Sequence, residues 1–297
     1  MSKIRYGLLV MTFLVFAFSI ACADIVPIPL DQLIMEEPDE KYYVSDREYE
    51  DPSIHVVIEE GTYLETRYLV ARIQIQDPSQ IRSYMTGGKK LGGSATYGQK
   101  ISKKIHPVLA ISGDLVSLGE SKAGKHIVRL GKTLLSRANG TVDCLIIDDQ
   151  GDMTILTRAT EDDIAAFEGT IISSYGFGPA IVVDGVQMTD FSYRNNVYGG
   201  NKNAQRICIG QTGKLSYIAV VTAGPDQKNL DGSKCRGLTI SEFSDLVYAQ
   251  GDVINAYNLD GGSSSYMLFR DEKINAFGNK SLRAINDVIY FASAYHE

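Results

Sequence analysis

The sequence NLDGGSSS at residues 258–265 closes an apolar segment, residues 253–259, that is expected to form a strand. Asp260 therefore stands at the tip of that strand, before two glycines that can adopt positive φ angles and let a ligand approach the backbone. The serines add hydroxyl groups, and successive backbone N–H groups can form a nest for an anion. A turn in which Asp260 caps its own backbone would explain the same residues without a ligand. The motif predicts either a tight turn or a binding site for an oxygen-rich or anionic group.

The segment before this strand carries the clearest helix signal in the chain. Thr239 is a favourable N-cap residue, and Glu242 stands three residues later, where a capping box places it. Phe243, Leu246 and Val247 follow with the spacing of a helix that buries one side. A helix is predicted here, and it delivers the chain to the strand described above.

The rest of the chain is dominated by short β-branched segments. Strands are expected at residues 54–58, 68–75, 108–111, 145–147, 153–156, 180–186, 206–210 and 215–222, and the first two should pair as an opening hairpin. Two further helices are indicated, one at residues 96–104 and a short one capped by Thr160 with Asp163 at the box position. Strands that outnumber well-separated helices predict an α+β fold. We expect a single domain with a mixed, mostly antiparallel β-sheet and a few packed helices.

The N-terminal segment differs from the rest of the chain. Lys3 and Arg5 precede an apolar run at residues 6–23, which is the pattern of an export signal. The run also approaches the length of a membrane span, so an uncleaved anchor competes with cleavage after Ala23. A lipid on Cys22 is a third interpretation. All three predict that the folded part lies outside the cytoplasm.

These signals give an expected division of the chain. Residues 1–23 are a signal peptide or an N-terminal anchor, so the protein is either secreted or associated with a membrane through this segment. Residues 24–53 are acidic, contain proline and are expected to be a spacer. Residues 54–297 then form the functional domain.

Composition and cysteine spacing exclude several classes of protein. With 297 residues, the chain is long enough for a core that needs no disulfide bonds. A net charge of −7 would repel a nucleic-acid backbone, so no nucleic-acid partner is expected.

The four cysteines lack the CxxC spacing of a zinc site. Cys144 and Cys208 lie in apolar runs and are expected to be buried thiols, although a disulfide between Cys208 and Cys235 is also compatible with the sequence.

Four motifs follow one another along the chain. They are AISGD at residues 110–114, SYGFGP at 174–179 with VDG at 183–185, RICIG at 206–210 and NLDGGSS at 258–264. In this order they resemble the motifs of the phosphodiester glycosidases, the family of N-acetylglucosamine-1-phosphodiester alpha-N-acetylglucosaminidase. The resemblance extends over residues 54–292. It implies a hydrolase domain whose partner is a carbohydrate or a sugar phosphate.

The chain departs from the family's motifs at several positions. Ser112 stands where the family has Asn, and Leu115 and Val116 replace aromatic residues. Ser263 replaces a third glycine, and Pro225 stands where an arginine is expected. The missing aromatic faces would weaken stacking on a sugar ring, which favours either a different sugar or a role in binding alone.

The chemistry of glycoside cleavage points to particular side chains. Such cleavage generally uses two carboxyl groups, and Asp114 and Asp260 each follow an expected strand, so they are the predicted catalytic pair. Arg206 is the predicted third catalytic residue, because its planar fork matches two phosphate oxygens. Turn capping for the two acids and a structural salt bridge for Arg206 are the alternatives. A divalent cation held by the two carboxylates is a further hypothesis, and no organic cofactor is indicated.

The remaining predicted site residues contact substrate. They are Ser112, Gly113, Gly261, Gly262, Ser263, Ser264 and Arg283. We expect the strands that end at Ile111 and Leu259 to be neighbours in one sheet, so that Asp114, Asp260 and Arg206 line one cleft.

The leading functional hypothesis is an exported hydrolase that cleaves a sugar-1-phosphodiester linkage in a glycan or an envelope polymer. One alternative is a noncatalytic carbohydrate- or envelope-binding protein of the same fold. Another is an accessory factor in exopolysaccharide assembly.

Overall fold

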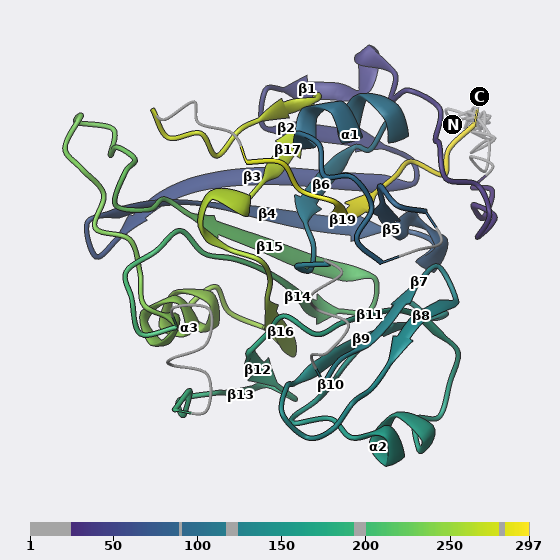
Figure 1. Ribbon diagram of the computed structural model, residues 1–297. Coiled ribbons are helices and arrows are strands. Elements are labelled where there is room, and N and C mark those ends of the chain that lie inside the picture. The colour runs from purple at the N-terminus through teal and green to yellow at the C-terminus, as the bar shows by residue number, and fades with distance from the viewer. Residues whose placement is uncertain (1–24, 89–90, 117–123, 193–199, 279–282, 297) are drawn as a thin grey trace, which may run out of the picture.

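The computed structural model describes residues 25–88, 91–116, 124–192, 200–278 and 283–296 (Figure 1). The predicted signal or anchor segment, including Cys22, lies outside these residues, so the expectation of export stays a prediction. Within the described residues, no helix has both the length and the apolar character needed to cross a membrane.

The largest sheet has nine strands, in the order β1-β2-β3-β4-β15-β14-β16-β12-β13. Their bounds are β1 (Tyr43–Ser45), β2 (Glu48–Asp51), β3 (Ile54–Tyr63), β4 (Thr66–Ile75), β12 (Ala180–Val183), β13 (Val186–Gln187), β14 (Ile207–Gly213), β15 (Ser216–Thr222) and β16 (Asn255–Asn258). The predicted opening hairpin is confirmed, because β3 and β4 pair along their whole length. Part of the predicted spacer is also structured, since β1 and β2 extend the edge of this sheet beyond β3.

Two five-stranded sheets complete the β structure. One has the order β10-β9-β11-β7-β8 and the other β18-β17-β6-β19-β5. The bounds in the first are β7 (His126–Arg129), β8 (Lys132–Ser136), β9 (Cys144–Asp148), β10 (Met153–Leu156) and β11 (Ile171–Tyr175). Those in the second are β5 (Ile81–Met85), β6 (Leu109–Ser112), β17 (Met267–Phe269), β18 (Glu272–Lys273) and β19 (Asp287–Phe291).

The helices of the described residues are few and short. They are α1 (Gly98–Ile105), α2 (Glu161–Ala165) and α3 (Ile240–Tyr248), with single turns of 3-10 helix at η1 (Glu40–Tyr42), η2 (Pro78–Gln80) and η4 (Gly262–Ser264). Both predicted capping boxes are confirmed, at α2 through Thr160 and Asp163 and at α3 through Thr239 and Glu242. The fold is therefore more β-rich than a balanced α+β protein.

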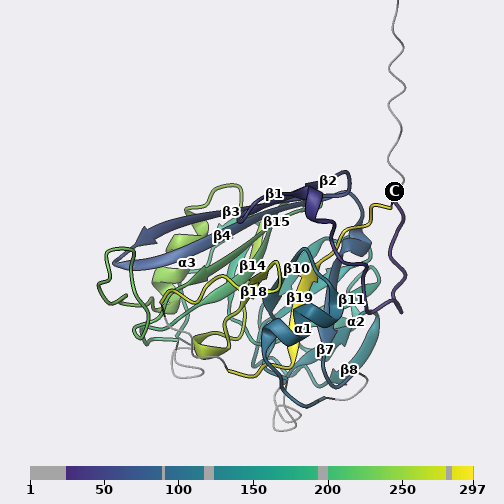
Figure 2. The same ribbon diagram turned by 90° about the horizontal axis from the view of Figure 1, so that it is seen from above.

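The three sheets share one hydrophobic core. Alternate residues of the large sheet, such as Val56, Leu69 and Ile209, pack in the same cluster as Ile111 of β6 and Leu145 of β9. Figure 2 shows β3 and β4 along one side of the molecule, with β19, β7 and β8 away from them. The opposite face of the large sheet is covered by α3, which forms a second cluster with it. The strand ends of different sheets therefore meet at the borders of a common core.

Two expectations about the sheets are wrong. Every strand pairing in the described residues is antiparallel, and three sheets replace the single mixed sheet. The strands that end near Ile111 and Leu259 are also not neighbours in one sheet. The reason is that β6 already has β17 and β19 on its two edges, while β16 has β14 and β12.

The described cysteines are all buried, free thiols. Cys144 and Cys208 are 1% and 0% exposed, as their apolar surroundings predict. The disulfide between Cys208 and Cys235 that the sequence allowed is not formed.

Candidate functional site

The loops that follow β6 and β16 meet at the border between two sheets. The backbone N–H of Asp260 donates a hydrogen bond of 3.1 Å to the carbonyl oxygen of Gly113. A pocket of about 170 Å³ opens beside this contact. Six predicted site residues line it: Ser112, Gly113, Asp114, Asp260, Ser264 and Arg283. The expected convergence of the two carboxylates thus occurs, although the two strands belong to different sheets.

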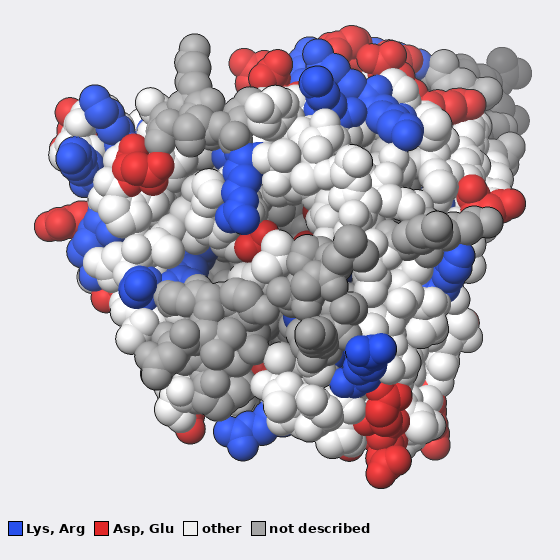
Figure 3. Space-filling view, in the orientation of Figure 1, with Lys and Arg blue, Asp and Glu red and all other residues white. Residues whose placement is uncertain are grey.

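The surface around the pocket is hollowed. Figure 3 shows a hollow near the centre of the face that Figure 1 presents, with acidic atoms at its floor and a basic side chain beside it. A site that combines both signs of charge suits a substrate that carries hydroxyl groups and an anionic group.

The carboxyl group of Asp260 lies in the pocket and has a raised pKa. Burial raises the pKa of Asp260 to about 6, and the negative charge of Asp114 acts in the same direction. The Ser264 hydroxyl, which hydrogen-bonds to Asp260, lowers the pKa, as do the positive charges of Arg283 and Lys125. A carboxyl group with a pKa near neutrality can exchange protons with a substrate or with water at physiological pH.

Asp114 is in a different environment, because both of its oxygens are already engaged. Oδ1 lies 3.3 Å from the ammonium of Lys125, and Oδ2 accepts a hydrogen bond of 2.7 Å from the N–H of Gly176. The side chains of Asp114 and Lys125 are both 0% exposed. Glycine is required at position 176, because a Cβ there would lie 2.9 Å from Cγ of Lys125. Asp114 is thus fixed in orientation by a buried ion pair.

A second buried ion pair contacts the backbone of Asp114. Arg129 donates from Nε and Nη2 to the two oxygens of Asp287, at 2.8 and 2.7 Å. Oδ2 of Asp287 also accepts from the N–H of Asp114, at 2.8 Å. Burial raises the pKa of Asp287, and the positive charge of Arg129 opposes this. Gly113 allows the arrangement, because a Cβ at that position would collide with the Asp287 carboxylate.

The sequence reasoning missed Lys125, Arg129 and Asp287. A signal was available for two of them, since Arg129 ends the strand HIVR and Asp287 opens the strand DVIYF, and ionic groups inside apolar strands are rare unless paired. Lys125 lies in none of the four motifs. Its role depends on a contact with Asp114, eleven positions earlier in the chain, which no local pattern reveals.

Arg206 does not line the pocket. Its side chain is buried and donates from Nε to the carbonyl of Leu238 at 3.0 Å, and from Nη2 to the carbonyls of Gly200 and Lys202 at 3.2 and 2.7 Å. It points to the α3 side of the large sheet, the same side as Cys208 two residues later. Burial lowers the pKa of Arg206 to about 10. The guanidinium fork therefore holds main-chain carbonyls, and Arg283 is the arginine of the pocket.

The two glycines after Asp260 allow close packing against the backbone carbonyl of Gln205. The N–H of Gly262 donates to the carbonyl of Gln205 at 2.8 Å, and a Cβ on Gly261 would lie 2.8 Å from the same oxygen. Gly262 has a φ of 58°, which favours glycine. Gly261, Gly262 and the exposed Ser263 were predicted to bind substrate, but they do not line the pocket.

The pocket does not offer the ligand set that a cation between Asp114 and Asp260 would need. Both oxygens of Asp114 have donors, and one of these donors is a lysine ammonium. A cation would have to compete with that ammonium for the same carboxylate.

These features define a β-rich protein with an acidic pocket at the junction of antiparallel sheets. The model of the phosphodiester glycosidase family matches residues 106–292, and the chain belongs to this family. The resemblance inferred from the four motifs is therefore confirmed. The matched span contains Asp114, Asp260 and both buried ion pairs.

Comparison with solved structures agrees on the fold. The catalytic domain of zebrafish N-acetylglucosamine-1-phosphodiester alpha-N-acetylglucosaminidase, auto-inhibited by its pro-peptide, is 17% identical with a TM-score of 0.63, covering 82% of this chain and 84% of that one. A hypothetical protein from Synechocystis is 12% identical with a TM-score of 0.52, covering 80% of this chain and 62% of that one. No match was found among curated proteins.

Proposed function

We propose that this protein is an exported hydrolase that cleaves a sugar-1-phosphodiester linkage in a glycan or an envelope polymer. The observation that carries the proposal is that Asp260, whose pKa is raised to about 6, and Arg283 line the same pocket. Family membership supports the reaction class. The substrate named for the zebrafish enzyme supports a phosphodiester-linked sugar.

A mechanism follows from the two kinds of charge in the pocket. A phosphate leaving group is stable as an anion and needs charge stabilisation more than protonation. Arg283 contacts that anion, since guanidinium groups match phosphate oxygens. Asp260 in its ionised form takes a proton from water as the water oxygen bonds to the anomeric carbon. The bond from that carbon to the phosphate oxygen breaks, and its electron pair leaves with the phosphate.

Asp114 has a supporting role in this mechanism. Lys125 and Gly176 occupy its oxygens, so it positions the loop after β6, and its negative charge adds to the rise in the pKa of Asp260 that burial causes. In this mechanism only one carboxyl group, that of Asp260, accepts a proton. This differs from glycosidases that rely on two, and the acidity of the leaving group explains the difference.

Asp260→Asn tests the proposal most simply. Asparagine keeps the size and the contact with Ser264 but cannot accept a proton, so turnover of a sugar-1-phosphodiester should fall by about 10²–10⁴-fold. Binding of the same compound, measured by calorimetry, should persist. If the wild-type protein binds the compound but does not hydrolyse it, the protein is a noncatalytic carbohydrate-binding member of the family. The engaged oxygens of Asp114 are the observation that favours this second function.

Export is the remaining part of the proposal. Intact-mass measurement on protein recovered from outside the cytoplasm should give a chain that begins at Asp24. Retention of residues 1–23 would indicate an anchor, and added lipid mass on Cys22 would indicate a lipoprotein.

A further inference from the structure

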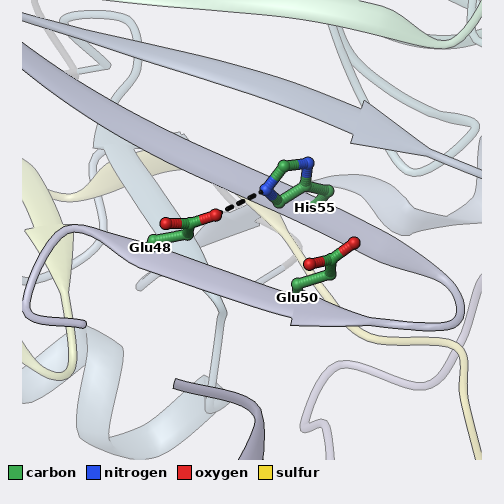
Figure 4. Close-up of side chains that lie close together, drawn as sticks. All are labelled: Glu48, Glu50 and His55. Carbon is green, nitrogen blue, oxygen red and sulfur yellow. Dashed lines mark hydrogen bonds and ion pairs between the residues drawn. The ribbon is translucent and has the colours of Figure 1, made fainter. Parts of the chain in front are cut away.

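The outer face of β2 and β3 gathers three side chains that can bind a metal ion. Glu48 and Glu50 lie two residues apart on β2 and therefore point to the same side. His55 on β3 is directly opposite Glu50 in the strand register. One ligand atom from each of the three lies within 4.8 Å of the others, as Figure 4 illustrates.

The charges in this group are not balanced by neighbouring lysine or arginine residues. His55 Nε2 lies 3.1 Å from Oε1 of Glu48. In the part of the chain that the structure describes, Glu48 and Glu50 form no ion pair with Lys or Arg. Glu59, farther along β3, is by contrast paired with Arg72 at 3.1 Å. Two carboxylates thus lie beside a single imidazole, which contacts only Glu48, and a cation could offset the remaining negative charge.

We propose that Glu48, Glu50 and His55 bind a divalent metal ion of the zinc type. The donor set of one imidazole nitrogen and two carboxylate oxygens suits Zn²⁺ and similar transition metals better than Mg²⁺ or Ca²⁺, which prefer oxygen ligands. Zinc lies about 2.0–2.2 Å from such atoms, so two ligands of one ion are at most about 4.4 Å apart. Small rotations of the glutamate side chains, which extend from the strands toward solvent, bring the observed separation into this range.

The site is independent of the pocket and of the proposed hydrolase activity. It lies on strands β2 and β3, before the residues 106–292 that match the family. A bound ion would connect β2, near the edge of the large sheet, to the long strand β3. Because such an ion binds the folded protein only, it would stabilise this edge in proportion to its concentration.

Titration of the full exported chain with Zn²⁺, without a histidine tag, tests the site. Calorimetry should show one ion bound per chain. His55→Ala should weaken zinc affinity at least about tenfold, since replacing even an indirect partner of a metal ligand costs that much. Glu50→Gln should do the same. Glu59→Gln, which removes one negative charge from the same face of the sheet, should leave the affinity unchanged.

Thermal melting provides an independent measurement. Zinc should raise the Tm of the wild type and of Glu59→Gln, but not that of His55→Ala, while Mg²⁺ should raise none of them. Circular dichroism of the metal-free variants checks that each is folded. Zinc binding of equal strength in the wild type, His55→Ala and Glu50→Gln would overturn the proposal, as would the absence of wild-type binding below millimolar concentration. Either result would leave only an ion pair between His55 and Glu48.

Discussion

The loop after β6 and the loop after β16 each place an aspartate at a strand end, yet the two carboxylates differ. The side chain of Asp114 is 0% exposed and has both oxygens engaged by Lys125 and Gly176. Asp260 faces the same pocket with a pKa near 6, because burial is only partly offset by Ser264 and nearby positive charges. The comparison shows that the role of each acid is set by what surrounds it and cannot be read from its position in a motif.

Lys125→Met should produce the largest effect on stability. It leaves the buried carboxylate of Asp114 without its charge partner, and breaking such a pair costs about 3–5 kcal/mol. Denaturant unfolding at pH 7 measures the loss. Lys214→Met is the matched control, because the pair of Lys214 with Asp152 is 59% and 45% exposed and should contribute at most about 1 kcal/mol. Equal losses in the two variants would show that Asp114 does not depend on Lys125.

Arg283→Lys should have the next largest effect, and it should depend on the substrate. Lysine keeps the charge but loses the planar fork, so hydrolysis of a phosphodiester-linked sugar should slow about tenfold to a hundredfold. Hydrolysis of an uncharged aryl glycoside of the same sugar should change little. Steady-state kinetics with both substrates provides the comparison.

Arg206→Lys is the control for that experiment, since the same exchange is made outside the pocket. The Arg206 guanidinium donates to three main-chain carbonyls, so the variant should lose stability and should slow both substrates equally. A selective loss on the phosphodiester in this variant would instead restore Arg206 as the phosphate-binding residue.

Besides its loss of activity, Asp260→Asn should change stability less than Lys125→Met does and in the opposite direction, as a gain in stability at neutral pH. The pKa of Asp260 is about 6 in the folded protein and 3.8 in its ordinary state, so the folded protein holds this proton more tightly than the unfolded chain. Ionisation therefore costs stability progressively as the pH rises from about 4 through 6. Asparagine removes that cost, and the variant should be more stable by up to about 3 kcal/mol at pH 8 but not at pH 4. A gain of the same size at both pH values would argue against the raised pKa.

The sequence predicted local structure better than it predicted contacts between distant segments. The capping boxes at Thr160 and Thr239 and the hairpin of β3 and β4 depend on neighbouring residues, and these predictions are confirmed. The division into three sheets depends on which strands flank β6 and β16, which no local pattern specifies.

The same difference between local patterns and distant contacts applies to the candidate site. The motifs identified Asp114 and Asp260 because each follows its own strand. Arg206 was predicted to line one cleft with the two acids, but it does not line the pocket. The preference of its fork for phosphate oxygens applies equally to the main-chain carbonyls that it binds. Lys125 is identified only through its contact with Asp114, which no local pattern of the sequence reveals.

The pH dependence of kcat/KM on a sugar-1-phosphodiester tests most directly the claim that Asp260 carries the proton as a base. Only the ionised form accepts a proton from water, so kcat/KM should rise with pH and reach a plateau, with a midpoint near 6, the pKa of Asp260. The residual activity of Asp260→Asn should lack this transition. A wild-type profile that is flat from pH 5 to 8, or that falls as the pH rises through 6, would contradict the account.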